Sequence, residues 1–314
     1  MGFLKRLASV LTTLFGISVF VFVVLRVIPG DTITSSLGIE TGVLTPEQID
    51  TLRAYYGIDK PLVGQYLSWM ASFLSGDLGF SYSTGAPVWD LTKSALLVTM
   101  QLALFGTILG VLIGISIGMF SARKPGSARD FLGQFFGLLA LAIPGFVLST
   151  TIVTVMANKF QYFPNGYEYM TPFEDLSMNL QQMLFPSLVL GIAVAAPIMR
   201  TTRSALLETV DKDFVRTAYG KGVKPRIVRL RHVLRNSLIP IVTMTGIQFG
   251  YLLGGAVIVE KIFALPGMGR QILDAINKRE YATVQSSIMV FAILFVTINL
   301  ITDWVYRKVD PRIK

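Results

Sequence analysis

The chain has 314 residues, about two soluble-domain lengths, but its composition excludes a pair of ordinary soluble domains. Apolar residues make up 52% and charged residues 15% of it, whereas soluble domains carry about 25% charged residues. The absence of cysteine excludes disulfides, thiolate metal sites and cysteine nucleophiles, and the single histidine, His232, excludes any site that needs two. The net charge of +9 must be interpreted through its distribution along the chain.

Stretches without Asp, Glu, Lys or Arg give the first structural prediction. Six of them, each between 19 and 29 residues long, are Leu7–Leu25, Ser94–Ala122, Phe131–Asn158, Leu176–Met199, Asn236–Val259 and Tyr281–Thr302. Each is long enough to cross a hydrocarbon core about 30 Å thick as a helix. A signal peptide is the alternative for the first stretch, but its length and the missing cleavage site favour a retained span. The sequence therefore predicts an all-α polytopic membrane protein with six transmembrane helices.

Basic residues predict the orientation of these spans. With the N-terminus in the cytoplasm, 19 of the 28 Lys and Arg residues fall in cytoplasmic segments. An even number of spans returns the C-terminus to the same side, where Arg307, Lys308, Arg312 and Lys314 fit. We therefore attribute the net positive charge to the membrane topology rather than to nucleic-acid binding.

The segment between the first two spans predicts a small helical extracellular or periplasmic cap. Thr45 and Gln48 form a capping-box pattern with Pro46 between them, and the helix that follows would carry Ile49, Leu52, Tyr55 and Tyr56 and end at Gly57. Residues 65–74 predict a second short helix. The resulting organisation is an N-terminal transmembrane helix in 1–30, the cap in 31–93, a membrane core in 94–303 and a cytoplasmic tail in 304–314.

Glycines recur at helical spacing in two spans and predict close helix packing. They are Gly106, Gly110, Gly114 and Gly118 in the second span, and Gly246, Gly250 and Gly254 in the fifth. Glycine costs about 1 kcal/mol in a helix but allows two helix backbones to approach closely in a bilayer.

Residues 200–235 form the most highly charged segment, with ten basic and three acidic residues interleaved with apolar ones. Gly220, Gly222 and Pro225 divide it, which predicts two short helices on the cytoplasmic side. Composition alone leaves two interpretations open: a basic loop beside anionic lipid, or a docking surface for a cytoplasmic partner.

Motifs for chemistry are weak. Residues 114–118 match the G-x-S-x-G pattern of hydrolases around Ser116, but they lie in an apolar helix and only His232 could act as a base. No phosphate-binding P-loop motif occurs, so ATP hydrolysis by this chain is not expected, and His232 is interpreted as a hydrogen-bonding residue. None of the six stretches contains Asp, Glu, Lys, Arg or His, which argues against a proton relay. Gln101 and Asn299 are the sparse candidates for lining a self-sufficient channel or carrier, and each has helix packing as its alternative.

Several blocks, in order and spacing along nearly the whole chain, resemble one family. These blocks are residues 22–31, 56–62, 65–66, 76–79, 213–218, 221–222, 231–240, 254–260, 263–270 and 310–312. The chain resembles the type I importer permeases of ATP-binding-cassette transporters, specifically the first permease subunit of dipeptide, oligopeptide and nickel systems.

This resemblance implies a role for the coupling loop, residues 211–231. It is similar to the cytoplasmic loop in which a short helix docks into a groove of the ATPase, although Arg216, Thr217 and Ala218 replace the usual Glu-Ala-Ala triplet. The implied coupling residues are Asp213, Phe214, Val215, Arg216, Thr217, Ala218, Lys221 and Gly222. We expect Phe214, Val215 and Ala218 to enter the partner groove, and Arg216 and Lys221 to meet its acidic residues.

The resemblance also implies the partners, the location and the substrate class. We expect a second homologous permease, two ATPase subunits that use ATP and Mg²⁺, and an extracellular binding protein, in a bacterial or archaeal cytoplasmic membrane. The chain itself is expected to hold no cofactor and no metal and to be no enzyme. Peptides are the leading substrate, with nickel chelates, glutathione or oligosaccharides as alternatives for the same machine. A self-sufficient channel or carrier is the alternative from another class.

Overall fold

A computed structural model of the chain describes residues 3–27, 45, 47–48, 51 and 59–309. Within these residues the fold is helical, and an isolated antiparallel bridge joins Phe80 to Pro87. The α-helices are α1 (Phe3–Val27), α4 (Leu62–Leu74), α5 (Val88–Ala122), α6 (Ala128–Ala142), α7 (Gly145–Phe160), α8 (Leu176–Val210), α9 (Asp213–Gly220), α10 (Pro225–Ile227), α11 (Arg235–Ile262), α12 (Met268–Asn277) and α13 (Tyr281–Val309). Pro164–Gly166 form a 3₁₀ turn, and Val228–Leu234 form a π-helix.

Among the described residues, five helices are long and apolar enough to cross a membrane, and a bent pair gives a sixth candidate if both of its halves belong to one span. The five are Lys5–Val27, Val88–Ala122, Leu176–Val210, Pro225–Ile262 and Tyr281–Thr302. They match five of the predicted charge-free stretches, so the all-α polytopic fold is confirmed.

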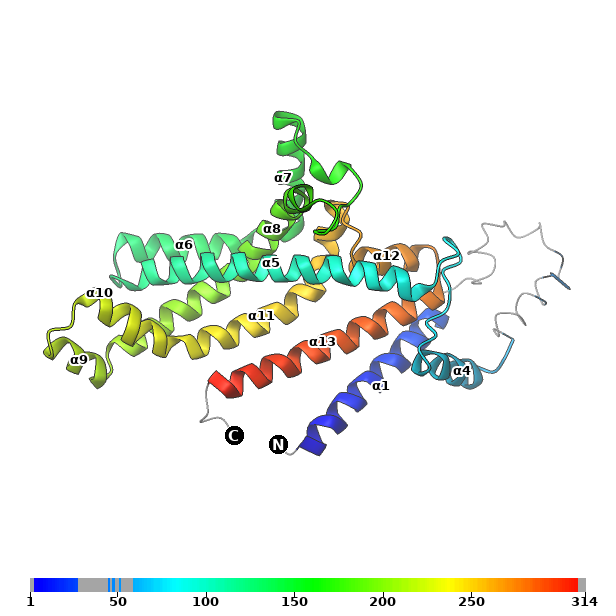
Figure 1. The fold of residues 1–314 in the computed structure, drawn as a ribbon, viewed down its shortest axis with the longest axis horizontal. Helices are drawn as coiled ribbons and strands as arrows, with labels where there is room; N and C mark the ends of the chain where they lie inside the picture. Colours follow the sequence, from blue (N-terminus) through cyan, green and yellow to red (C-terminus); the bar gives the residue numbers. More distant parts are fainter. Residues whose placement is uncertain (1–2, 28–44, 46, 49–50, 52–58, 310–314) are drawn as a thin grey trace. The chain divides into compact units, whose positions relative to one another are not determined.

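The third predicted span is not one straight helix. α6 and α7 meet at an angle of 91°, and Figure 1 shows α7 leaving the line of α6. The cause is Pro144, which lacks an amide hydrogen and pushes the residue before it out of the helical region. Ile143 accordingly has φ −86° and ψ 116°. The prediction of an unbroken span over 131–158 was wrong because the absence of charge does not reveal this break.

Contacts divide the chain into two compact units. The first contains residues 1–97 and 266–297, and the second contains 98–265 and 298–314. In the first unit, Val21 and Leu25 of α1 pack with Ala275 of α12 and Val284 of α13.

Aromatic contacts hold the described part of the cap against α1. The ring centroid of Phe22 lies 5.2 Å from that of Tyr66 and 6.2 Å from that of Trp69. Ser18 and Tyr66 also share a hydrogen bond of 2.8 Å between their hydroxyl oxygens. The second predicted cap helix therefore exists, and it begins at Leu62 rather than at residue 65.

The capping box predicted in the cap is also formed. The backbone N–H of Thr45 donates to Oε1 of Gln48 at 2.9 Å, and the N–H of Gln48 donates to Oγ1 of Thr45 at 3.3 Å. The predicted continuation through Ile49, Leu52, Tyr55 and Tyr56 to Gly57 lies outside the described residues.

In the second unit α8 packs against α6, α7 and α11. The glycines of α5 lie against α8 at close range. A Cβ atom built on Gly110 would lie 2.7 Å from Val194, one on Gly114 2.8 Å from the carbonyl oxygen of Ala195, and one on Gly118 2.7 Å from Thr202. A Cβ on Gly106 would lie 3.0 Å from Leu190. A side chain larger than hydrogen would force these two helices apart.

The glycines of α11 have different surroundings. Gly246 faces Thr302 of α13 at contact distance, and Gly250 is buried. A Cβ on Gly254 meets no atom within 4 Å, nor does one on Gly255. The close packing expected along this glycine series therefore does not extend to Gly254 within this chain.

Candidate functional site

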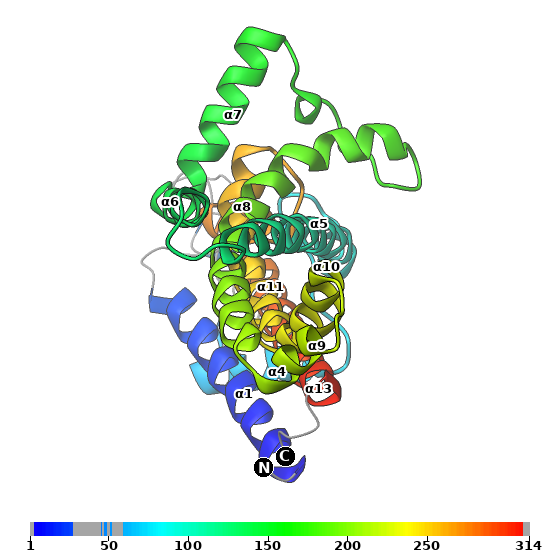
Figure 2. The ribbon, with the colours of Figure 1, turned by 90° about the vertical axis from the view of Figure 1, so that its left-hand side faces the viewer.

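The coupling loop begins where α8 ends at Val210, and α9 forms its first helix. Figure 2 shows α9 and α10 together at the ends of α8 and α11. α9 is closed at its C-terminus by Gly222, whose φ of +75° lies in the left-handed region. The N–H of Gly222 donates to the carbonyl of Tyr219 at 2.9 Å, and that of Val223 donates to the carbonyl of Ala218 at 3.2 Å. This pair of bonds is the Schellman motif, which explains why glycine is needed at this position.

The apolar face of α9 is turned inward. Val215 and Ala218 are buried in a cluster with Leu206 of α8 and with Val228 and Val233 of the π-helix. The expectation that Val215 and Ala218 enter a partner groove was therefore wrong. An amphipathic pattern identifies a face that is covered, but it does not say which surface covers it.

The other predicted coupling residues lie on the outer surface of the loop. Phe214 and Tyr219 are each 43% exposed. Arg216 and Lys221 are also exposed. The remaining predicted residues, Asp213, Thr217 and Gly222, are exposed as well. α9 thus presents aromatic and basic groups outward while its aliphatic groups anchor it to the chain.

The second predicted short helix of this loop is not a separate element. α10 continues into the π-helix and then into α11, so Pro225–Ile262 form one continuous helical run. Lys224 has ψ 135° and Pro225 follows at the first helical position, which starts this run sharply. The loop is therefore continuous with the fifth span.

A buried carboxylate fixes the ends of three spans beside this loop. Asp130 of α6 is 2% exposed, and its carboxylate accepts hydrogen bonds from Nε and from one terminal nitrogen of Arg203 of α8, each at 2.7 Å. The hydroxyl of Ser121 in α5 donates to it at 2.6 Å, the N–H of Gly126 at 2.9 Å and the amide of Gln134 at 3.0 Å. A buried carboxylate with this many donors is stably charged and links α5, α6 and α8.

Charge-free stretches do not reveal the buried acids Asp130 and Glu260, because each of them lies just outside the bounds of such a stretch. Asp130 stands just before the stretch that begins at Phe131, and Glu260 stands just after the one that ends at Val259. Both are inside the observed helices. Glu260 is fully buried, and the hydroxyl of Thr99 donates to its Oε1 at 2.6 Å. The signal that could have found them is an acid at the edge of an apolar span.

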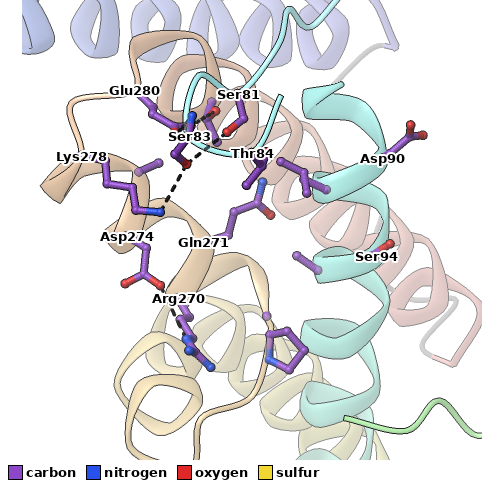
Figure 3. Close-up of a pocket in the computed structure, with 16 residues that line it drawn as sticks. Ser81, Ser83, Thr84, Asp90, Ser94, Arg270, Gln271, Asp274, Lys278 and Glu280 are labelled. Atoms are coloured by element: carbon purple, nitrogen blue, oxygen red, sulfur yellow. Dashed lines mark hydrogen bonds and ion pairs between the residues drawn. The ribbon is translucent and has the colours of Figure 1, made fainter. Parts of the chain in front are cut away.

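A polar pocket lies within the first unit, between α12, the N-terminal turns of α5 and the segment 81–84 (Figure 3). Its volume is about 530 Å³, within the range of small-molecule sites. Nζ of Lys278 donates to the hydroxyl of Ser83 at 3.2 Å, and Arg270 pairs with Asp274 at 3.6 Å. Oε1 of Gln271 is buried in this pocket without a hydrogen-bond partner. The pocket therefore offers groups of both charge signs and one unused acceptor.

Glu280 forms one end of the pocket. It is 3% exposed and accepts hydrogen bonds from the N–H of Ser83 at 3.1 Å and from the hydroxyl of Thr283 at 2.7 Å. Burial by itself would raise the pKa of Glu280, but the hydrogen bonds from Ser83, Thr283 and Ser81 outweigh it, and the pKa lies below its ordinary value. The group is an anion at neutral pH.

The structure also bears on the rival sites. Gly114, Ser116 and Gly118 lie inside α5, in its last third, so the strand-to-helix turn that a hydrolase nucleophile requires is absent at this motif. The amide of Gln101 donates to Asn179 at 2.5 Å, and the hydroxyl of Tyr169 donates to Gln101 at 3.0 Å. These hydrogen bonds support helix packing as the role of Gln101, rather than the lining of a channel or carrier.

Two family models match the chain. The model described as the binding-protein-dependent transport system inner membrane component matches residues 114–314, and the model of the N-terminal part of such membrane components matches residues 1–103.

The curated relatives align along nearly their whole length. The chain is 34% identical over 311 residues to the glutathione transport system permease protein GsiC of Escherichia coli K12, covering 99% of this chain and 98% of that protein. It is also 34% identical over 312 residues to GsiC of Pectobacterium atrosepticum, with the same coverage.

Solved structures show the same fold at low sequence identity. The inward-facing MetNI methionine ABC transporter gives a TM-score of 0.55 at 16% identity, covering 70% of this chain and 96% of that one. An amino acid ABC transporter crystallised with histidines gives 0.51 at 17% identity, covering 71% of this chain and 94% of that one.

Proposed function

The chain belongs to the family of binding-protein-dependent transport system inner membrane components, and on this premise we propose that it forms the translocation path of a peptide importer with a second, homologous permease. It is a multi-pass inner-membrane permease of the ABC type I importers, in the peptide and glutathione family. Such an importer works with ATPase subunits and a substrate-binding protein. We further propose two ATPase subunits, which use ATP and Mg²⁺, so that this chain carries the path without the hydrolysis.

The break at Pro144 supports a partner permease. Ile143, Pro144 and Gly145 are exposed on the surface of this chain, although they interrupt an apolar segment that together is long enough to cross a membrane. Irregular backbone is not stable in contact with lipid tails, because its polar groups find no hydrogen bonds there. It is tolerated where another protein chain or a water-filled path covers it. A second permease lying against this corner, with the path between the two chains, meets that requirement.

The outer face of α9 supports ATPase docking. Phe214 and Tyr219 remain exposed while the aliphatic residues of the same helix are already used in the chain's own core. Aromatic residues and arginine are enriched where protein interfaces are strongest. This is the single observation that carries the coupling proposal: a short helix, rigidly anchored from behind, presents Phe214, Arg216 and Lys221 to the cytoplasm.

The distribution of basic residues supports the membrane orientation. The basic residues of 200–235 cluster at the coupling loop, and 19 of 28 basic residues fall on that side in total. We therefore place both termini and α9 in the cytoplasm, and α4 and α12 outside, in a bacterial or archaeal membrane.

Peptide-class substrates fit the available chemistry best. The matched relatives are named for glutathione, which is itself a peptide, and the external polar pocket offers cationic, anionic and amide groups within reach of one another (Figure 3). A zwitterionic peptide uses all three kinds of group, whereas an oligosaccharide uses no charge. We propose glutathione or another short peptide as the substrate, with nickel chelates and oligosaccharides as the alternatives.

Co-purification followed by an ATPase assay tests the coupling proposal. Phe214→Ala combined with Arg216→Glu should release the ATPase subunits or uncouple hydrolysis from transport. Phe131→Ala combined with Arg129→Glu is a matched control, because it changes the same residue types at exposed positions outside the loop. We expect the control to keep its ATPases. A loop variant that retains coupled transport would refute docking through α9.

Transport into proteoliposomes tests the substrate. The complete importer with its binding protein should accumulate labelled glutathione or a labelled short peptide in the presence of ATP. Uptake of only a nickel chelate or an oligosaccharide would replace the peptide proposal while leaving the permease function intact.

A further inference from the structure

A groove lies in the second unit where three spans end beside the coupling loop. It is formed by residues 119–123 at the end of α5, residues 206–210 at the end of α8, and residues 226–233 of α10 and the π-helix, and its volume is about 330 Å³. We call it the arginine groove. Its volume is comparable to that of small-molecule sites.

The arginine groove has an apolar interior and a cationic edge. Leu206 and Val233 are buried within it, whereas Arg123, Arg226 and Arg229 are exposed along it. Within the part of the chain that the structure describes, no carboxylate pairs with any of these three guanidinium groups. Three cations gathered beside apolar side chains without a counter-ion leave an excess of positive potential at one place.

The position of the groove decides which anion it fits. It is built from the ends of helices that are long and apolar enough to cross a membrane, so in the orientation proposed above it lies at the cytoplasmic boundary of the bilayer. A phospholipid with a negatively charged headgroup matches both parts: its phosphate meets the arginines and its acyl chain covers the leucine and valine surface. Basic pockets between transmembrane helices on the cytoplasmic side bind anionic headgroups in this way.

We propose that the arginine groove is a binding site for an anionic phospholipid of the cytoplasmic leaflet. The proposal rests on the orientation given under the proposed function. It concerns a surface of the coupling loop separate from the outer face of α9, since the groove is lined by residues from α5, α8, α10 and the π-helix.

A lipid in this groove would also brace the coupling loop. Leu206 and Val233 line the groove and belong to the same cluster that holds Val215 and Ala218 of α9. The occupied groove would therefore stabilise the surface on which α9 rests, and the emptied groove would leave that surface against water or neutral lipid. We expect anionic lipid to raise the coupled ATPase activity of the assembled importer.

The test uses the complete importer in nanodiscs of phosphatidylcholine alone or mixed with phosphatidylglycerol. Arg226→Gln combined with Arg229→Gln removes two charges of the groove, and Arg231→Gln combined with Arg235→Gln is the control. The control residues are exposed on the same helical run but do not line the groove. Retained phosphatidylglycerol is measured by native mass spectrometry, and ATPase activity is measured in both lipid compositions.

An arginine near an anionic surface contributes about fivefold in binding, so the groove variant should hold phosphatidylglycerol about 25-fold more weakly than the wild type, whereas the control should lose much less. The groove variant should also lose its response of ATPase activity to phosphatidylglycerol. Equal retention and equal stimulation in both variants would overturn the proposal.

A further experiment adds soluble glycerol phosphate in order to distinguish a free phosphate ligand from a lipid. If it alone reproduces the stimulation at the wild-type groove, then the ligand is a free phosphate and the lipid proposal fails. Coupled transport in phosphatidylcholine nanodiscs is measured in parallel, so that a loss of ATPase docking, which would concern the proposed function, is distinguished from a loss of lipid binding.

Discussion

Substituting alanine for Gly114 should destabilise the permease because α5 and α8 have no space between them at this point. The added Cβ would lie 2.8 Å from the carbonyl oxygen of Ala195 and 2.9 Å from Ile198. The first of these atoms is backbone, so relief requires a shift of one helix. Overpacking costs about 1–3 kcal/mol, and a contact with backbone favours the upper end. The higher helix propensity of alanine returns about 1 kcal/mol. The net loss should be about 2 kcal/mol.

Gly254→Ala is the matched control in the same unit. It makes the same change inside a membrane-spanning helix, but its Cβ would meet no atom within 4 Å. In the isolated subunit it should therefore gain about 1 kcal/mol from helix propensity. Equilibrium unfolding of the two purified variants in detergent measures the difference, which we expect to be about 3 kcal/mol. Equal stabilities would refute the packing argument.

The same control variant also reports on the partner permease. If Gly254 faces a second chain in the assembled importer, then Gly254→Ala should leave the isolated subunit stable but weaken co-purification of the partner.

The remaining predictions concern two buried carboxylates, Asp130 and Glu280. Asp130→Asn removes the charge that Arg203 pairs with and should lower the free energy of unfolding by about 3 kcal/mol. Arg203→Lys keeps the positive charge and should lower it by less. Equal losses of stability in thermal unfolding would contradict a role for the charge itself. Glu280 has a folded-state pKa below 4.5, so its carboxylate stabilises the fold above the unfolded-state pKa, and this contribution is lost as the pH falls through the folded-state pKa. Wild type should therefore be more stable than Glu280→Gln at neutral pH, and the difference should shrink below pH 4.5; a difference that does not depend on pH would count against this assignment.

The sequence predicted the membrane class and six spans, five of which are matched by continuous helical runs, because these features depend on the spacing of apolar and charged residues. The break at Pro144 was missed because hydropathy depends on side chains, whereas the break arises from a missing amide hydrogen and a steric clash of the backbone. Pro186 and Pro197 lie inside α8 without ending it, so a proline by itself does not settle the outcome.

The sequence predicted short helices in the coupling loop and an apolar face on the first of them, but not what covers that face. An apolar stripe at Val215 and Ala218 correctly indicated a covered face, but Leu206, Val228 and Val233 of the same chain cover it. These three residues belong to neighbouring elements whose approach depends on the π-helix and on the turn at Gly222. A local pattern does not contain that information, and the outward position of Phe214 becomes visible only in three dimensions.

The continuous run from Pro225 to Ile262 has a mechanical consequence. Its 38 residues would extend about 57 Å as a straight helix, well beyond a hydrocarbon core about 30 Å thick. The two features that soften it, the π-helix over Val228–Leu234 and Pro240, both lie near the end at the coupling loop. The remaining length, as far as Ile262, contains no proline and no π-helical turn and should move as one piece. Bending under a force applied at the loop is therefore expected at that end of the run, whereas the rest of the span follows as a rigid element.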